Sequence, residues 1–246
     1  MIHDGMPRTR VNLRSPSPLM ERPAAASLLA AVAGLMNAWT FQHAGSFATV
    51  QSGNIVSAGY FAAAGDGRRL GAVLMSIVAF AVGAAVCAVV VGLLAHAGRP
   101  YSPLILAAEA VLVAALVPLS QVAPALWVAV AVSAVAGVQG NAFHRDRGML
   151  YGNTAVTFVL QSTASLLGRA LIARTAGDGE PHLRPAGVYA LVLLAFAGGG
   201  AGGFLADSVW PAASLAAAAT ILAAMGLLTA LWRRGPVDPS QNAPTP

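Results

Sequence analysis

The sequence GSFATVQSGNIVSAGY (residues 45–60) is polar, although it lies between two long apolar runs. Its polar side chains are those of Ser46, Thr49, Gln51, Ser52, Asn54 and Ser57, and the glycines that divide it are Gly45, Gly53 and Gly59. In a bilayer, polar and helix-loosening residues at this density are tolerated only where they line a cavity or pack against protein. The stretch therefore indicates where a site in the membrane lies.

The composition of the whole chain is that of a membrane protein. Of its 246 residues, 57% are hydrophobic and only 9% are charged, and the mean hydropathy is +0.69, whereas a soluble domain carries about 25% charged residues. A helix of about 20 apolar residues crosses the hydrocarbon core. The pattern predicts an all-α, polytopic transmembrane bundle whose apolar runs cover residues 23–44, 47–64, 70–96, 103–121, 124–143, 149–168, 186–206 and 210–232.

The sequence favours six full spans plus two polar, interrupted or short membrane segments, and eight spans are the alternative. If the two polar runs, 47–64 and 149–168, are short or interrupted, six full spans remain; if they cross, there are eight. All 14 basic residues are arginines at the ends of apolar runs, and both counts place each terminus in the cytoplasm by the positive-inside rule. We expect one transmembrane domain over 23–232, with disordered cytoplasmic tails at 1–22 and 233–246.

Two halves of the chain, about 23–121 and 124–232, resemble each other. AGLMNA (33–38) is similar to AGVQGNA (136–142), and AFAVGAA (79–85) is similar to AFAGGGA (195–201). Internal repeats are the usual plan of secondary transporters; an even number of crossings per repeat gives parallel halves and an odd number inverted ones. The small residues Gly198/Gly202 and Gly199/Gly203, with Ala79, Gly83 and Cys87 in the first half, predict close helix packing.

The motifs in both halves resemble those of the YoaK family of uncharacterised bacterial inner-membrane proteins. Its first pattern, G-x-x-D-A-x-x-F followed by F-x-x-x-x-T-G-N, is matched at Gly34, Ala38, Phe41, Phe47, Gly53 and Asn54, with Asn37 in place of Asp and Ser52 in place of Thr. The second-half pattern is matched at Gln139, Asn141, Ala142, Thr154 and Thr157. The resemblance implies a multispan, permease-like protein of the inner membrane. An amide at position 37 cannot titrate, although it still forms hydrogen bonds.

The residues expected along a substrate path come from both halves. They are Asn37, Gln51, Ser52, Gly53 and Asn54 in the first half, and Gln139, Asn141, Asn153, Thr157 and Gln161 in the second. The alternative is that these groups only join helices, through hydrogen bonds worth about 0.6 kcal/mol each. Glu109, within an apolar run, is either a proton or cation site or a packed, protonated or interfacial residue, since a charged acid there costs roughly 2.5 to 3.5 kcal/mol.

No pattern in the chain indicates catalysis. There is no G-x-S-x-G, H-E-x-x-H or P-loop, and the histidines have no metal-ligand spacing, so we expect no enzyme, metal or cofactor. The arginines do not form one patch, so nucleic acid is not an expected partner. The expected partners are the lipid bilayer and an unidentified small polar solute or ion, and a homo-oligomer is left open. The two hypotheses are a small permease and, alternatively, a non-transporting membrane scaffold or partner subunit.

Overall fold

The computed structural model describes residues 18–143, 145–146, 149–150, 156–176 and 181–239. A short 3₁₀ helix, η1 (Leu19–Glu21), precedes the first long helix. The helices are α1 (Pro23–Ala44), α2 (Gln51–Ala63), α3 (Gly67–His96), α4 (Ser102–Leu119), α5 (Ala125–Ala142), α6 (Val156–Ala176), α7 (Leu183–Val209) and α8 (Ala213–Leu231). Two short antiparallel strands, β1 (Arg145–Asp146) and β2 (Met149–Leu150), lie between α5 and α6.

Six of these helices are long and apolar enough to cross a membrane: α1, α3, α4, α5, α7 and α8. Helix α2 has 13 residues and is about 20 Å long at 1.5 Å per residue, too short for a hydrocarbon core of about 30 Å. In α6, the described stretch Val156–Ile172 is an apolar helix shorter than these spans. The predicted all-α bundle is confirmed, with six candidate membrane spans.

The chain segment after α8 connects three parts of the molecule at one end of the bundle. The carboxylate of Asp238 accepts hydrogen bonds from the backbone N–H groups of Tyr101 (2.9 Å) and Ser102 (2.8 Å), at the start of α4. The backbone N–H of Leu19, just before α1, donates to the carbonyl of Pro236 (3.0 Å). These contacts join the segment after α8 to the starts of α1 and α4.

These contacts agree with six candidate spans. The start of α1, the start of α4 and the segment after α8 lie at the same end of the bundle. Two candidate spans, α1 and α3, lie between the first two of these points, and four, α4, α5, α7 and α8, lie between the last two. Both numbers are even, as this arrangement requires, and each half then contains three candidate spans, the odd number typical of inverted repeats.

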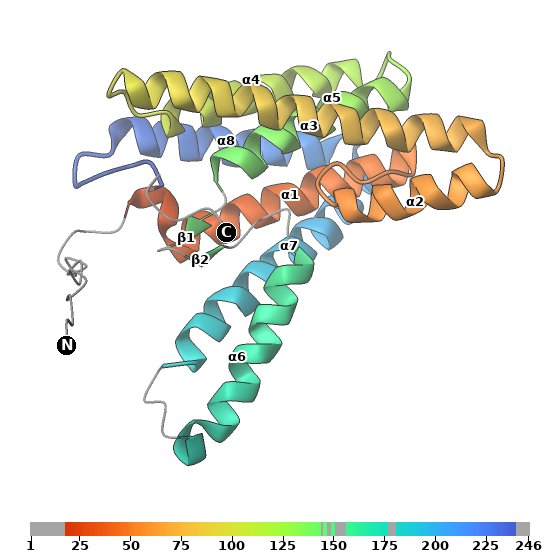
Figure 1. The fold of residues 1–246 in the computed structure, drawn as a ribbon. Coiled ribbons are helices and arrows are strands. Elements are labelled where there is room, and N and C mark those ends of the chain that lie inside the picture. The colour runs from red at the N-terminus through yellow and green to blue at the C-terminus, as the bar shows by residue number, and fades with distance from the viewer. Residues whose placement is uncertain (1–17, 144, 147–148, 151–155, 177–180, 240–246) are drawn as a thin grey trace, which may run out of the picture.

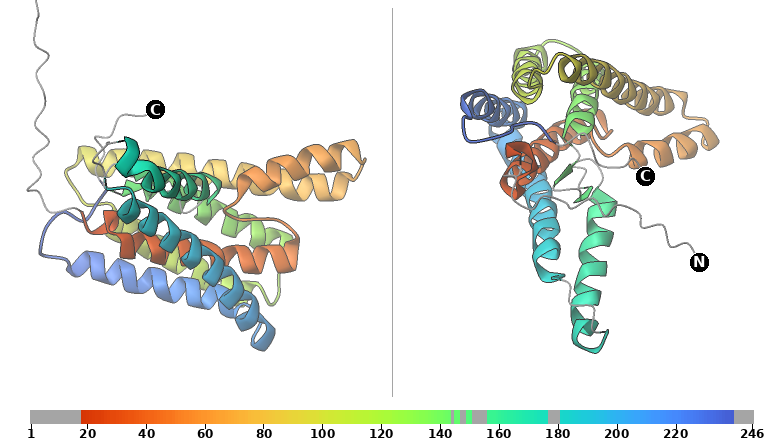
Figure 2. Two further views of the ribbon diagram at one scale, coloured as in Figure 1. Left: turned by 90° about the horizontal axis from the view of Figure 1, so that it is seen from below. Right: turned by 60° about the vertical axis from the view of Figure 1, so that its left-hand side comes forward.

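Long helices of one half pack mainly against long helices of the other half. The most extensive contacts are those of α1 with α7, α3 with α5 and α4 with α8, each joining one half to the other. Helix α2 packs on α3, and α6 packs on α7. Figures 1 and 2 show these two hairpins extending from the layered bundle: α2–α3 runs past the end of α1, and α6–α7 leans away from the remaining helices.

Glycines bring α1 and α7 into backbone contact. A Cβ added at Gly34 would lie 2.2 Å from the carbonyl oxygen of Phe196, and one added at Gly199 would lie 2.2 Å from that of Ala31. Real Cβ contacts are never this short, so neither position accepts a side chain without movement of the helices. Gly198, on the other side of α7, faces open space. Of the two glycine pairs noted in the sequence, the one containing Gly199 therefore faces α1.

The contact between α3 and α5 repeats this geometry. A Cβ at Gly137 would lie 2.0 Å from the carbonyl oxygen of Phe80, and one at Gly83 would lie 2.0 Å from that of Ala134. The residues correspond one to one with those of the α1–α7 contact: 31 to 134 and 34 to 137 are both 103 apart, and 80 to 196 and 83 to 199 are both 116 apart. The two interfaces are thus related by the internal repeat.

Candidate functional site

The loop between α1 and α2 is fixed by the amide of Asn37. Gly45 ends α1 in a left-handed conformation (φ 64°), which glycine adopts without steric cost. Beyond it, the backbone N–H of Thr49 donates to the amide oxygen of Asn37 (3.0 Å), and the amide nitrogen of Asn37 donates to the hydroxyl of Thr49. Both groups of this buried side chain are therefore used within the protein.

A second amide, that of Asn54, joins α2 to the loop and to two spanning helices. Its oxygen accepts from the backbone N–H of Phe47 (3.1 Å), and its nitrogen donates to the carbonyl of Phe47 (2.7 Å), to Gln51 (2.9 Å) and to Ser76 of α3 (3.1 Å). The Ser76 hydroxyl in turn lies 2.8 Å from that of Ser133 on α5. Asn54 is 1% exposed, so its role is to hold the loop.

The first turns of α2 and α6 border an open hollow of about 530 Å³, the central hollow. Its polar lining comes from both halves of the chain: Thr49, Gln51 and Ser52 from the first, and Thr157 and Gln161 from the second. The side chains of Ser52, Thr157 and Gln161 are exposed, and no hydrogen bond within the described part of the chain involves them. These hydroxyl and amide groups are therefore free to bind a polar molecule.

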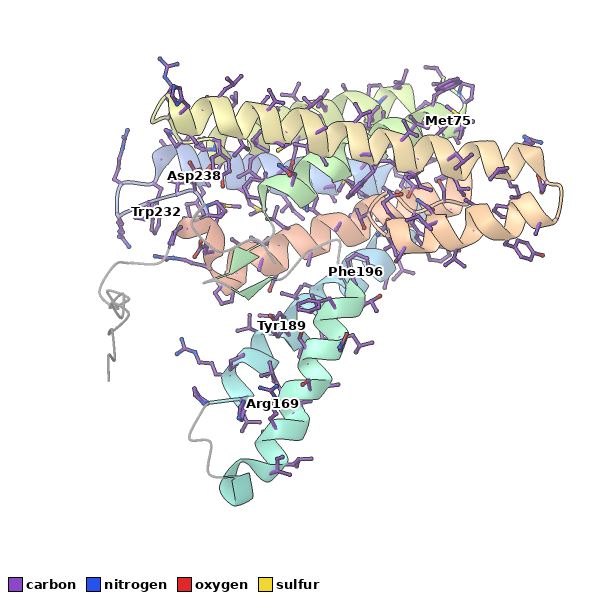
Figure 3. All side chains as sticks on the ribbon, viewed as in Figure 1. Met75, Arg169, Tyr189, Phe196, Trp232 and Asp238 are labelled. Atoms are coloured by element: carbon purple, nitrogen blue, oxygen red, sulfur yellow. The ribbon has the colours of Figure 1, made fainter. Side chains whose placement is uncertain are left out.

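Two further hollows adjoin this one. The first, about 540 Å³ between α1 and α7, shares Val50 with it and is lined mostly by apolar groups, Phe196 among them. The second, about 350 Å³ between α6 and α7, shares Gln161 and includes Arg169 and Tyr189. Figure 3 shows Arg169 and Tyr189 on the α6–α7 hairpin and Phe196 near the point where that hairpin joins the bundle. The three hollows follow one another around the starts of α2 and α6.

The structure brings together some of the residues predicted for a substrate path and separates others. Those around the central hollow are Gln51, Ser52, Thr157 and Gln161. Gly53 lies beside it, where an added Cβ would be 3.3 Å from the ring of Phe47. Asn37 borders the apolar hollow, although its amide is occupied. Asn54 is likewise occupied.

The other predicted residues lie elsewhere. The amide nitrogen of Gln139 is buried and donates to the carbonyl of Leu29 on α1 (2.9 Å), so this side chain joins two helices. Asn141 is half-buried on α5, and none of the three hollows includes it. Glu109 lies inside the bundle on α4, outside all three hollows. Asn153 falls outside the described residues.

Several lining residues were missed by reasoning from the sequence. Val50, Phe80, Val156 and Phe158 all border the central hollow. They are apolar residues in apolar runs, and only the three-dimensional contact between the halves selects them. Thr49 could have been predicted as a lining residue, because it is one of the polar residues of the stretch 45–60.

The outer surface of the bundle is apolar, as a lipid environment requires. Helix α3 has the highest mean hydropathy of the six candidate spans. It nevertheless exposes apolar side chains along its length, those of Val78, Val82, Val86, Val89 and Leu93. Six apolar helices with an apolar outer surface define a multi-pass α-helical membrane protein.

A comparison with protein families agrees with this class. The model of the family described as "Protein of unknown function (DUF1275)" matches residues 25–228, and the chain belongs to that family. No curated protein and no solved structure matches the chain. The family relationship thus extends over the whole helical bundle, from α1 to α8.

Proposed function

We propose that the protein is a small permease that moves a polar solute or ion through the central hollow between α2 and α6. The observation that carries this proposal is the meeting of free hydroxyl and amide groups from both halves, at Ser52, Thr157 and Gln161, in a space of about 530 Å³. Polar groups without a partner are costly inside a membrane unless water or a solute reaches them. The YoaK resemblance agrees with a permease of the bacterial inner membrane.

The arrangement of the halves fits alternating access. In transporters built from inverted repeats, the substrate binds between the repeats and one part rocks against the other. Helix α2 packs extensively on α3 alone, and α6 on α7 alone. Each of these two helices is therefore attached to the bundle mainly through one neighbour, and a shift of α2 against α3, or of α6 against α7, changes the opening of the hollow between their first turns.

The charge distribution gives this permease an orientation. With six crossings, Arg68 and Arg69, at the turn between α2 and α3, are the arginines at the end opposite the chain termini. The remaining 12 of the 14 arginines lie on the terminal side. The positive-inside rule then places both termini in the cytoplasm.

Cysteine labelling tests whether water reaches the hollow. Cys87 is the single cysteine and is buried, so Cys87→Ala gives a background without reactive thiols. In that background, we expect Ser52→Cys and Thr157→Cys to react with a charged, membrane-impermeant methanethiosulfonate added to vesicles. Val89→Cys, on the lipid-facing side of α3, is the control and should remain unmodified. Equal protection of all three positions would contradict the proposal.

Transport itself is tested in proteoliposomes. A panel of polar solutes is first screened for ligands that raise the melting temperature of the purified protein, because a ligand specific to the folded state stabilises it. Uptake of any stabilising solute should then be lost in Ser52→Leu and Gln161→Leu. The scaffold alternative predicts instead that both substitutions are tolerated and that a partner protein co-purifies; the hydrogen-bonded amides of Asn37 and Asn54 agree with that structural role for their own positions.

A further inference from the structure

Glu109 is a buried acid that the central hollow does not use. It lies on α4 and is 1% exposed, and neither oxygen of its carboxyl group has a hydrogen-bond partner among the described residues. Asp207, the other acid buried in a spanning helix there, differs in this respect. Its oxygens accept from the backbone N–H (2.8 Å) and the hydroxyl (2.6 Å) of Ser214. The structure therefore accounts for Asp207 as a helix cap and leaves Glu109 without such a role.

The surroundings of Glu109 contain few polar groups. The helices packed against α4 are α8 and α5, and neither contains an acidic or basic residue. From α3, the buried Cys87 belongs to the same apolar core as Ala110 and Val113 of α4. Its thiol is the titratable group that α3 contributes to this core.

An apolar hollow of about 320 Å³ lies between α3, α4 and α5. Its lining includes Leu112 on α4 and Val82 and Val86 on α3, all of which are exposed. This hollow therefore opens on the apolar outer surface of the bundle, and Glu109 is not among its lining residues.

We propose that Glu109 is a reversible proton site, which binds one proton on a carboxyl oxygen and releases it during the working cycle. The coupling of this proton to solute movement rests on the permease function proposed above. A carboxylate without a partner is costly in hydrocarbon, and protonation removes the charge. A metal ion is a poorer occupant, because such ions take four or more ligands and the described residues contain no group of three metal-ligating side chains.

Infrared difference spectroscopy on the purified protein tests this directly. A protonated carboxyl group in an apolar environment has a distinct C=O stretching band. We expect this band in the wild-type protein in acidic buffer and its loss in alkaline buffer. The band should be missing from Glu109→Gln and retained in Asp207→Asn. A band that persists at every pH would identify Glu109 as a permanently protonated packing residue and overturn the proposal, as would the absence of any band that depends on Glu109.

Chemical labelling of the wild-type protein tests the site even if Glu109→Gln fails to fold. Dicyclohexylcarbodiimide is apolar and adds to protonated carboxyl groups. We expect it to modify Glu109 in a mapped peptide, at a rate that falls in alkaline buffer, whereas a water-soluble carbodiimide leaves Glu109 unmodified. Labelling that does not depend on pH would contradict reversible protonation.

Both measurements are made without solute, so they separate this proposal from the permease function. Titration of Glu109 in a protein that takes up no solute would retain the proton site and reject the permease. Solute uptake in a protein whose Glu109 does not titrate would retain the permease and reject the proton site.

Discussion

The contact between α1 and α7 gives a prediction of stability that can be worked from distances. A Cβ added at Gly199 would lie 2.2 Å from the carbonyl oxygen of Ala31, whereas ordinary contacts of this kind begin at 3.4 Å. Gly199→Ala therefore requires the helices to separate by about 1.2 Å at this point, and overpacking of this kind costs about 1 to 3 kcal/mol. The better helix propensity of alanine offsets about 1 kcal/mol. We expect a net loss of up to about 2 kcal/mol of unfolding free energy.

The same helix supplies the control for this prediction. An added Cβ at Gly198 meets no atom within 4 Å, so Gly198→Ala should leave the stability unchanged or raise it by up to about 1 kcal/mol. Gly83→Ala, the equivalent change in the first half, should be destabilising like Gly199→Ala. Unfolding in micelles with increasing sodium dodecyl sulfate, followed by circular dichroism, measures all three. If Gly199→Ala proves as stable as Gly198→Ala, the close approach of the two backbones is wrong.

Three further predictions use the same unfolding assay. Asn54→Leu leaves the backbone N–H of Phe47 without its partner, although the Phe47 carbonyl still accepts from the Ser76 hydroxyl. This change should cost about 1 to 3 kcal/mol, whereas Ser52→Ala should be neutral; equal stability of the two variants would remove the structural role of Asn54. Asp238→Ala removes the cap of α4 and should cost about 0.5 to 2 kcal/mol, with faster amide hydrogen exchange at the start of α4; unchanged exchange would contradict the cap. Glu109→Leu replaces an unpaired buried acid by an apolar side chain and should raise the unfolding free energy by about 1 kcal/mol. It should also abolish the infrared response to pH. A destabilised variant would show that the carboxyl group has a stabilising partner.

Much of the fold could be predicted from the sequence, because hydropathy follows directly from residue type. The run predicted at 23–44 coincides with α1, and the polar runs 47–64 and 149–168 correspond to α2 and α6, which are not among the six candidate spans. The choice between six and eight spans could not be made, because it depends on contacts such as that of Asp238 with Tyr101, which are 137 residues apart. No local pattern encodes such a pair.

The candidate site was only partly predictable for a similar reason. Ser52, Thr157 and Gln161 were identified because polar residues in an apolar run are conspicuous, and they border the central hollow. Asn37 and Asn54 are also polar residues in or beside apolar runs, yet their amides bind neighbouring backbone groups. A polar side chain that binds protein and one that faces a hollow differ in their surroundings, and composition does not report those surroundings.

The packing of first-half helices against second-half helices has a consequence for biogenesis. The closest partner of α1 is α7, which begins at residue 183, well after α1 ends at residue 44. At a synthesis rate of about 5 to 20 residues per second, α1 waits in the bilayer for roughly 7 to 30 s before α7 is made. During that interval the exposed backbone at Gly34 is covered by lipid or by an insertion factor. A membrane chaperone would therefore act mainly at the stage when only the first half has been synthesised.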